Sequence, residues 1–586
     1  MLNFFLKQKI RNAKVISFDI FDTLLVRPFL EPCNVFSYLG EVLQEKDFFA
    51  YRFNAENVLR QHGNAYPTYD AIYEIMPKKF QYIKEKERNL ELDTLFANPK
   101  IKKIYDYALK LKKKIIIVSD MYFDEETLKK ALNKNGYYGF DKIYISAYQK
   151  KSKWDTSLFT HIIDELKIDP QKIFHIGDNK VADYSSAKQV GIQAFRIKAP
   201  RDIFRKENKR LRPFIDKHKN TLTGGIIIGN AVKQMVLGKK SPNYWDEFGY
   251  SWGGPFAYAL SSFVVDQMRK DNRNELICVA RDGYTIEKIV NILAQEIKTH
   301  YIYAGRCINI LTSMDYSSDY SWCHKPASLI RLTRELSDEF AQKSKDTDLN
   351  SASACTAVIE KNIDLIEPIA NEVFSKYLDY LKNFDIREER LALFDITGGS
   401  YNSYKLLKRS LPNKDILGLY WYALDNPEIN CCKYSDHTQY TVSNYELLEF
   451  LITAPELPVK NLHPEDGFVR IDNKYEKQRI KCYQNISEAE IQWSKDYLDS
   501  FKETVIFDPV ILVEYMNVFC NKPSRKDVKH LSTVFHGKDE AHTIYERLFP
   551  KRKNIFQKMF YTKKHNGHKI FSILGIKIKF KIRKRK

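Results

Sequence analysis

The sequence predicts an α/β protein of several domains, because apolar strands alternate with helical segments over much of its length. A strand followed by a helix and another strand is the pattern of a parallel sheet. The chain has 586 residues, of which 44% are hydrophobic and 29% charged. At this length we expect three or four domains, each with an ordinary core, and exclude a short accessory module or a disordered chain.

The net charge of +20 lies mainly at the carboxy terminus, where residues 551–586 hold 14 basic residues and no acidic one. The first 550 residues therefore carry only +6. Since removal of this tail nearly neutralises the chain, a specific nucleic-acid partner is disfavoured. The sequence has no apolar run of transmembrane length, no leader pattern and no CxxC spacing among its nine cysteines. We expect a cytoplasmic protein with reduced thiols.

Four apolar strands in the first 200 residues end in polar residues. KVISFDIFDTLL carries Asp19 and Asp22, KKKIIIVSDMYFD carries Ser119, and a lysine-rich loop with Lys153 follows KIYIS. KIFHIGDNKVAD carries Asp178 and, five residues later, Asp183. The carboxyl ends of parallel strands meet in one crevice, where open α/β sheets bind ligands.

These residue types suit phosphoryl transfer. An aspartate can act as nucleophile, a hydroxyl and a lysine can bind phosphate oxygens, and further carboxylates can hold Mg²⁺. The order and spacing resemble the haloacid dehalogenase superfamily. The resemblance implies that Asp19 is the nucleophile, Ser119 binds the phosphoryl group, Lys153 stabilises charge, and Asp178 and Asp183 hold Mg²⁺ together with Asp19.

The same resemblance implies a haloacid dehalogenase-like phosphatase domain over residues 1–210, with a helical cap over about residues 29–109. One departure concerns the general acid, which phosphatases of this superfamily carry two residues after the nucleophile, where this chain has Phe21. General acid-base help contributes roughly 10²- to 10⁴-fold to a rate. Asp22 is the obvious substitute, but in an extended strand its side chain would point to the opposite face. A catalytic Asp22 and one that only caps the following turn both remain open.

A second α/β pattern occupies residues 211–475. NELICVARDGYTIEKIV is a strand, a turn at Arg281, Asp282 and Gly283, and a helix. THYIYAGRCINIL ends a strand at Gly305 and Arg306. RLALFDITGGSYNSYKLL predicts a strand ending at Asp395, with a loop from Thr397 to Ser400 that opens a helix.

The DITGGS segment can bind an anion. Gly398 and Gly399 let backbone N–H groups curl around a phosphate, hydroxyls come from Thr397, Ser400 and Ser403, and the following helix directs its positive end there. Asp395 could accept hydrogen bonds from sugar hydroxyls. An ordinary glycine-rich turn remains the alternative, because a lone glycine loop is weak evidence.

The strand, acid, TGG and helix arrangement is similar to the phosphoribosyl diphosphate loop of phosphoribosyltransferases, although the loop is shorter and Phe394 replaces one of two adjacent acids. ARDG sits where that fold has its diphosphate-binding loop. FDIFDTLL followed by ARDGY and DITGGS also resembles a group of bacterial surface-polysaccharide proteins. This resemblance implies a phosphoribosyltransferase-like glycosyltransferase domain that uses phosphoribosyl diphosphate, with a glycan or lipid-linked glycan acceptor.

The carboxy-terminal part carries fewer signals. YELLEFLITAPELPVKNL, residues 445–462, predicts a helix and a loop that either border an acceptor cleft or belong to the core. Residues 476–550 are helical in pattern. In the tail, residues 551–586, lysines alternate with Ile or Phe in either a strand or a helix, which favours attachment to an anionic membrane at about 1 kcal/mol per basic residue. A solubilising or RNA-binding tail is the alternative.

Together these patterns predict a Mg²⁺-dependent bifunctional enzyme, peripheral at the inner face of the cytoplasmic membrane. It would transfer 5-phosphoribose to a polysaccharide acceptor and then remove the 5-phosphate to leave ribofuranose. The rival interpretation is a single-function phosphohydrolase whose second domain binds a glycan or a partner without catalysis.

Overall fold

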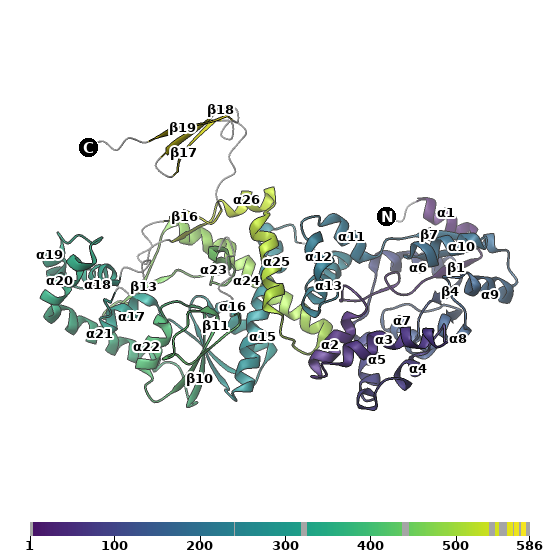
Figure 1. The fold of residues 1–586 in the computed structure, drawn as a ribbon, viewed down its shortest axis with the longest axis horizontal. Coiled ribbons are helices and arrows are strands. Elements are labelled where there is room, and N and C mark those ends of the chain that lie inside the picture. The colour runs from purple at the N-terminus through teal and green to yellow at the C-terminus, as the bar shows by residue number, and fades with distance from the viewer. Residues whose placement is uncertain are drawn as a thin grey trace.

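A computed structural model describes residues 4–239, 241–317, 325–435, 445–537, 545–549, 560–565, 568–573 and 576–581. The described chain contains two five-stranded parallel sheets, which lie in opposite halves of an elongated body (Figure 1). The prediction of an α/β protein with a parallel sheet is therefore confirmed. Helices occupy the space between the two sheets and most of the remaining chain.

The first sheet has the strand order β5-β4-β1-β6-β7. Its strands are β1 (Val15–Phe18), β4 (Lys114–Ser119), β5 (Lys142–Ile145), β6 (Ile173–Gly177) and β7 (Gln193–Arg196). Both faces are covered, since Ile115 and Ile117 belong to one buried cluster and Ile116 and Val118 to another. This explains why β4 reads as an uninterrupted apolar run. The surrounding helices are α1 (Phe4–Asn12), α6 (Pro99–Lys110), α7 (Glu125–Lys134), α8 (Ser146–Gln149), α9 (Ser157–Leu166) and α10 (Ser186–Gln189).

A helical insertion follows β1. It consists of α2 (Asn34–Val42), α3 (Phe48–Gln61), α4 (Tyr69–Glu74) and α5 (Ile83–Thr94), and it is entered and left through the antiparallel pair β2 (Leu25–Val26) and β3 (Phe96–Ala97). Inside it, the fully buried Arg52 guanidinium lies 2.8 Å from the Glu87 carboxylate. The predicted helical stretch is thus divided, because α6 leaves the insertion and packs on β4.

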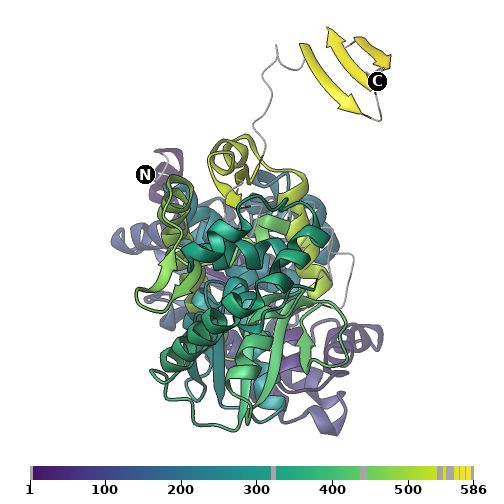
Figure 2. The ribbon, with the colours of Figure 1, turned by 90° about the vertical axis from the view of Figure 1, so that its left-hand side faces the viewer.

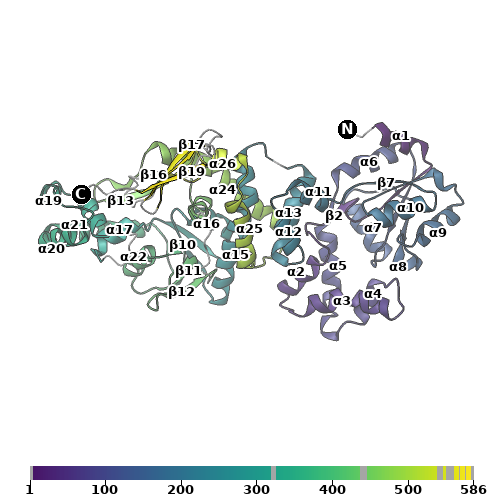
Figure 3. The same cartoon turned by 45° about the horizontal axis from the view of Figure 1, so that its top comes forward.

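Three helices follow the first sheet, namely α11 (Pro200–Glu207), α12 (Arg212–His218) and α13 (Leu222–Leu237). They lie between the two sheets in Figure 3, and α13 packs on α2 of the insertion. The contact is close at Gly229, where an added Cβ would lie 2.0 Å from the carbonyl oxygen of Pro28. Any side chain at position 229 would push the two segments apart.

The second sheet has the order β12-β11-β10-β8-β9. Its strands are β8 (Glu275–Val279), β9 (Lys298–Ile302), β10 (Arg390–Gly398), β11 (Asp415–Ala423) and β12 (Cys431–Lys433). Alternate residues of β10 face opposite clusters: Phe394 packs in one and Leu393 in the other. The surrounding helices are α14 (Tyr244–Phe248), α15 (Gly254–Lys270), α16 (Gly283–Leu293), α17 (Arg306–Ser313), α18 (Lys325–Arg334), α19 (Asp338–Ser344), α20 (Ala352–Lys361), α21 (Ile363–Leu381) and α22 (Asn402–Ser410).

Strand β10 is longer than predicted. The sequence predicts a strand that ends at Asp395, whereas β10 continues to Gly398 because Thr397 and Gly398 pair with Tyr422 and Ala423 of β11. The loop before α22 is correspondingly shorter. Its Tyr401 adopts the left-handed backbone conformation, with φ of 55°.

The carboxy-terminal helices cover the second sheet and reach the insertion. They are α23 (Tyr445–Leu451), α24 (Lys474–Phe501), α25 (Pro509–Asn521) and α26 (Arg525–Leu531), with the hairpin β13 (Val459–His463) and β14 (Gly467–Arg470) after α23. Helix α24 packs on α15 and α16, and its last residue, Phe501, lies with its ring 4.9 Å from that of Phe29.

The prediction of an entirely helical stretch over residues 476–550 is corrected at its end. Phe535–Gly537 (β15) and Tyr545–Arg547 (β16) form a two-stranded antiparallel sheet. The rings of Phe535 and Tyr545 pack on Tyr475 at 4.6 and 4.7 Å, a contact that a helical pattern does not reveal.

The tail forms three antiparallel strands: β17 (Phe560–His565), β18 (His568–Ile573) and β19 (Ile576–Lys581). They stand apart from the body in two perpendicular views (Figures 1 and 2). The sequence allows either a strand or a helix in the tail, and the tail adopts strands. The tail's side chains, and with them the predicted membrane contacts, lie outside the described part of the chain. None of the described helices combines the length and apolarity needed to cross a bilayer.

Candidate functional site

The residues predicted for phosphoryl transfer meet at the carboxyl edge of the first sheet. Asp19 directly follows β1, Ser119 is the buried last residue of β4, and Asp178 directly follows β6. Lys153 lies in the loop before α9, and its Nζ is 2.6 Å from Asp19 Oδ1 and 2.6 Å from Asp183 Oδ1. One buried cation thus joins two of the predicted carboxylates.

Asp19, Asp178 and Asp183 form a candidate metal centre. One oxygen from each carboxylate lies within 4.8 Å of the other two. Asp183 is held by a hydrogen bond of 2.8 Å from the Asn179 N–H to its Oδ2. It also approaches Gly177 so closely that a Cβ there would lie 2.3 Å from the Asp183 carboxyl carbon, which is why glycine ends β6.

The charges in this centre oppose one another. Burial raises the pKa of Asp19, Lys153 lowers it in part, and the negative charges of Asp183 and Asp178 raise it further. Burial, followed by the charges of Asp22 and Asp183, raises the pKa of Asp178 to about 7. Burial also acts to raise the pKa of Asp183, but Lys153 and a hydrogen bond with His175 outweigh it, so this pKa lies below its usual value.

A divalent cation fits this donor set. Mg²⁺ prefers carboxylate oxygens, and three such groups lie close together with their charges only partly compensated by Lys153. A cation there would relieve the mutual repulsion that raises the pKa values of Asp19 and Asp178. The residues therefore suit the predicted Mg²⁺.

Asp22 lies near this centre because the chain is no longer an extended strand at this residue, so the alternation of strand side chains does not apply to it. Strand β1 ends at Phe18, and Asp22 has a left-handed backbone with φ of 58°. Its N–H donates to the Leu25 carbonyl at 2.8 Å, and its carboxylate lies 3.1 Å from Arg201. Since Asp22 also raises the pKa of Asp178, its charge acts on the centre. The opposite-face argument therefore does not apply.

Phe21, which stands at the usual position of the general acid, contacts a cation. The Arg27 guanidinium lies 4.2 Å from the centre of the Phe21 ring and pairs with Glu91 at 3.0 Å. Phe21 and Arg27 thus stack at the junction between β1 and the insertion.

Sequence analysis did not predict three further residues of this site. His175 on β6 is buried, with Nδ1 2.7 Å from Ser17 Oγ and Nε2 3.2 Å from Asp183 Oδ1. Asp120 accepts a hydrogen bond of 3.0 Å from the Lys153 N–H. Arg201 comes from α11. A histidine inside the apolar strand FHIG was a usable signal for His175, whereas no local pattern marks Arg201.

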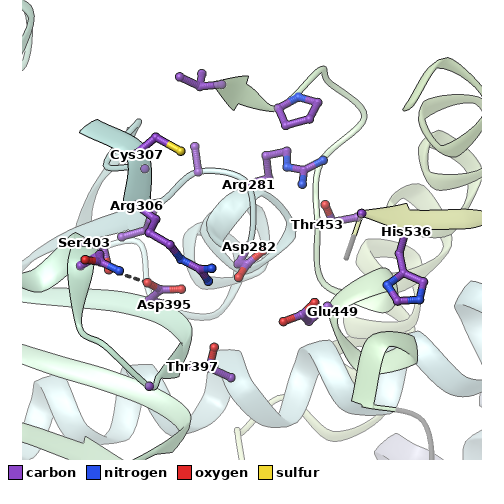
Figure 4. Close-up of a pocket in the computed structure, with 18 of the residues that line it drawn as sticks. Arg281, Asp282, Arg306, Cys307, Asp395, Thr397, Ser403, Glu449, Thr453 and His536 are labelled. Carbon is purple, nitrogen blue, oxygen red and sulfur yellow. Dashed lines mark hydrogen bonds between the residues drawn. The ribbon is translucent and has the colours of Figure 1, made fainter. Parts of the chain in front are cut away.

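The second site is a cavity of about 1080 Å³ at the carboxyl edge of the second sheet. Eight of the ten predicted donor-binding residues line it: Arg281, Asp282, Arg306, Asp395, Thr397, Gly399, Ser400 and Ser403. Figure 4 shows Arg306, Asp282 and Asp395 directed toward the same space.

Gly283 and Gly398 do not line this cavity. A Cβ at Gly398 would lie 2.6 Å from the Tyr401 ring and 2.7 Å from Ala423, and one at Gly283 would lie 2.6 Å from the Cys278 Cβ. Both glycines are needed for close packing behind the loops, which is a different role from the predicted contact with an anion.

Hydrogen bonds fix the loop between β10 and α22. Ser403 Oγ donates to Asp395 Oδ2, Asn402 Nδ2 donates to Ser400 Oγ, and Asn309 Nδ2 donates to Asn402 Oδ1 at 3.0 Å. Burial raises the pKa of Asp395 although the bond from Ser403 opposes this. The loop is therefore arranged before any ligand binds.

The opposite wall comes from α23, within the segment expected either to border an acceptor cleft or to belong to the core, and from α24 and β15, for which no binding role was predicted. Helix α23 contributes Glu446 and Glu449, α24 contributes Glu476 and Arg479, and β15 contributes His536. Glu476 accepts from Arg479 Nε at 2.8 Å and lies 3.4 Å from the Arg281 guanidinium, so it connects α24 to the ARDG turn. Residues 445–462 do border this cavity, through Phe450, Thr453, Pro458 and Val459 as well.

One family model matches the part of the chain that contains most of the first sheet. Residues 37–197 match the family described as haloacid dehalogenase-like hydrolase, a range that starts after Asp19. No curated protein matches the chain.

Solved structures similar to this chain include a haloacid dehalogenase family enzyme from Bacteroides thetaiotaomicron in complex with magnesium and inorganic phosphate. It has 19% identity over 32% of this chain and 95% of its own, with a TM-score of 0.25. Another is the L-2-haloacid dehalogenase of Xanthobacter autotrophicus, with 14% identity over 38% of this chain and 88% of its own, and a TM-score of 0.26. By the family match, residues 37–197 are part of a haloacid dehalogenase-like hydrolase domain.

Proposed function

We propose that this protein is a bifunctional enzyme of glycan assembly. The second domain transfers 5-phosphoribose from phosphoribosyl diphosphate to a glycan or lipid-linked glycan acceptor. The first domain, a Mg²⁺-dependent phosphatase, then removes the 5-phosphate and leaves ribofuranose. The observation that carries the proposal is that eight residues chosen as donor-binding from separate sequence segments line one cavity of about 1080 Å³.

The phosphatase step follows from the first site. An Asp19 carboxylate oxygen attacks phosphorus, the bond from phosphorus to the sugar oxygen breaks, and that oxygen takes up a proton as the sugar leaves. Water then hydrolyses the aspartyl phosphate and releases phosphate. Lys153, at 2.6 Å from Asp19, holds the nucleophile in place and offsets negative charge, while the Ser119 hydroxyl binds a phosphoryl oxygen. Mg²⁺ held by Asp19, Asp178 and Asp183 would neutralise charge on the phosphoryl oxygens.

The transfer step follows from the second site. Arg281 and Arg306 supply positive charge for the diphosphate, and Asp395 accepts hydrogen bonds from the ribose hydroxyls. Thr397, Gly399, Ser400 and Ser403 bind the 5-phosphate. A phosphate fits at this point because the loop leads into the amino terminus of α22.

The proposal is tested by incubating the full chain with phosphoribosyl diphosphate, Mg²⁺ and a lipid-linked or glycan acceptor, and measuring product masses. A product heavier by ribose, preceded by one heavier by phosphoribose, supports both steps. Hydrolysis of phosphate esters without any binding of phosphoribosyl diphosphate would favour the single-function hydrolase instead. Attachment to an anionic membrane through the tail is part of the proposal and is tested separately below.

A further inference from the structure

The cavity of the second domain has two chemically different walls. One carries the residues proposed to bind the donor, from the ARDG turn, the start of α17, the end of β10 and the loop that follows it. The other is α23, which presents Glu446 and Glu449. Neither glutamate is needed to hold the donor in the proposed function.

Glu449 faces the donor wall across the cavity. In the view of Figure 4 its carboxylate points toward Asp282, which lies between Glu449 on one side and Arg306 and Asp395 on the other. Burial raises the pKa of Asp282 well above its usual value, and the charges of Asp395 and Glu449 raise it further. Glu449 is the solvent-exposed member of this group, whereas Asp282 is partly buried.

A metal-binding role does not account for these carboxylates. Among the described residues, the group of three or more possible metal ligands is Asp19, Asp178 and Asp183 of the first domain. Asp282, Asp395 and Glu449 do not form such a group as arranged here. An exposed acid that faces a bound donor instead suits proton transfer.

We infer that Glu449 is the general base of the transfer reaction. This assignment rests on the proposed function, because it presumes that the donor occupies the opposite wall. The acceptor enters between the donor and α23. As its oxygen forms a bond to the anomeric carbon of ribose, its proton passes to a Glu449 carboxylate oxygen. The bond from that carbon to the diphosphate oxygen breaks, and diphosphate leaves with the electron pair.

The test uses Glu449→Gln in the full chain, because glutamine keeps the size of the side chain and cannot accept the proton as a carboxylate does. The donor is phosphoribosyl diphosphate with Mg²⁺, and the acceptor probes are water and methyl hexopyranosides. We expect diphosphate release to fall about 10²- to 10⁴-fold. Donor affinity by calorimetry and hydrolysis of p-nitrophenyl phosphate should stay within twofold of wild type, as in the control Glu465→Gln on an exposed turn.

A pH profile separates catalysis from a structural role. The wild-type rate should fall at acid pH as the base is protonated, and the residual rate of Glu449→Gln should lack this acid limb. Diphosphate release within threefold of wild type would overturn the assignment. So would a loss in Glu446→Gln or His536→Gln but not in Glu449→Gln, or a wild-type protein that binds the donor without ever turning it over. A wild-type protein that does not bind phosphoribosyl diphosphate would refute the proposed function itself.

Discussion

The Lys153 ammonium group lies 2.6 Å from the Asp19 carboxylate, although 134 residues separate them in the sequence. The same nitrogen lies 2.6 Å from Asp183, so a single buried cation positions both the proposed nucleophile and a proposed metal ligand. Changes at either carboxylate should affect the first site and leave the second site intact.

Asp19→Asn should abolish phosphate release, by at least about 10³-fold, because an amide is not a competent nucleophile. Transfer from phosphoribosyl diphosphate should continue, and a product heavier by one phosphate should accumulate in mass spectra. Asp164→Asn, an exposed position on α9, is the matched control. Phosphate release at the wild-type rate would show that Asp19 is not the nucleophile.

Asp395→Asn should weaken binding of phosphoribosyl diphosphate roughly tenfold or more, because Asp395 is a partly buried acceptor in the proposed ribose subsite. Hydrolysis of p-nitrophenyl phosphate should not change. Calorimetry with the exposed control Asp466→Asn checks this expectation. Equal affinities would remove the phosphoribosyltransferase interpretation. Gly398→Val should lower the stability of the protein, because its side chain would push Tyr401 and Ala423 out of place.

His175→Gln should lower Mg²⁺ affinity by roughly 10- to 100-fold, the usual effect of removing a group that orients a metal ligand. His175 contacts Asp183 at 3.2 Å and Ser17 at 2.7 Å, so its loss leaves the carboxylate less constrained. Mg²⁺ titration calorimetry measures the effect, with His161→Gln on α9 as control. An unchanged affinity would mean that Lys153 and the Asn179 N–H suffice.

Glu490→Gln should stabilise the protein at alkaline pH. Burial raises the pKa of Glu490 well above its usual value, and its Oε1 has no hydrogen-bond partner among the described residues. The folded state keeps a proton on Glu490 that the unfolded state releases above about pH 4.5. The contribution of Glu490 to wild-type stability is therefore complete below pH 4.5 and is lost as pH rises toward the folded-state pKa. The glutamine variant lacks this loss. Its Tm should exceed that of wild type more at pH 8.5 than at pH 5.5, and a constant difference would contradict this account.

Deletion of residues 551–586 should release the protein from anionic vesicles. The tail holds 14 basic residues and no acid, and its charge should act within a Debye length of roughly 8 Å. Co-sedimentation with anionic and neutral vesicles at low and high salt measures this. Equal binding of the full-length and shortened chains would reject membrane attachment, and loss of both activities would show that the tail supports the fold.

The strand-end residues were predictable because their positions follow from local patterns. Asp19, Ser119 and Asp178 each follow or end an apolar run, and parallel strands place such ends together. Arg201 was not assigned a role, and the segment that contains Glu449 was expected either to border an acceptor cleft or to belong to the core, with no role for Glu449 itself. Their place depends on packing between segments far apart in the chain.

Two errors have a common physical origin. The extension of β10 to Gly398 depends on a partner strand, β11, and the β15–β16 pair depends on aromatic contacts with Tyr475. The bounds of a strand depend on the segments that pair with it or pack on it. The sequence of one segment alone therefore predicts a strand that ends too early, or predicts no strand.

Helix α24 is synthesised after both sheets, and this order affects how they fold. Its first turn lies beside the cavity of the second domain, which Glu476 lines. Its last residue is Phe501, where Tyr38 of the helical insertion donates a hydrogen bond to the carbonyl oxygen. A nascent chain that stops before residue 474 already contains both sheets but lacks the helix that covers Tyr258 of α15 and Phe29. During synthesis, α15 and the helical insertion therefore keep apolar side chains uncovered until α24 has been made and can pack on them.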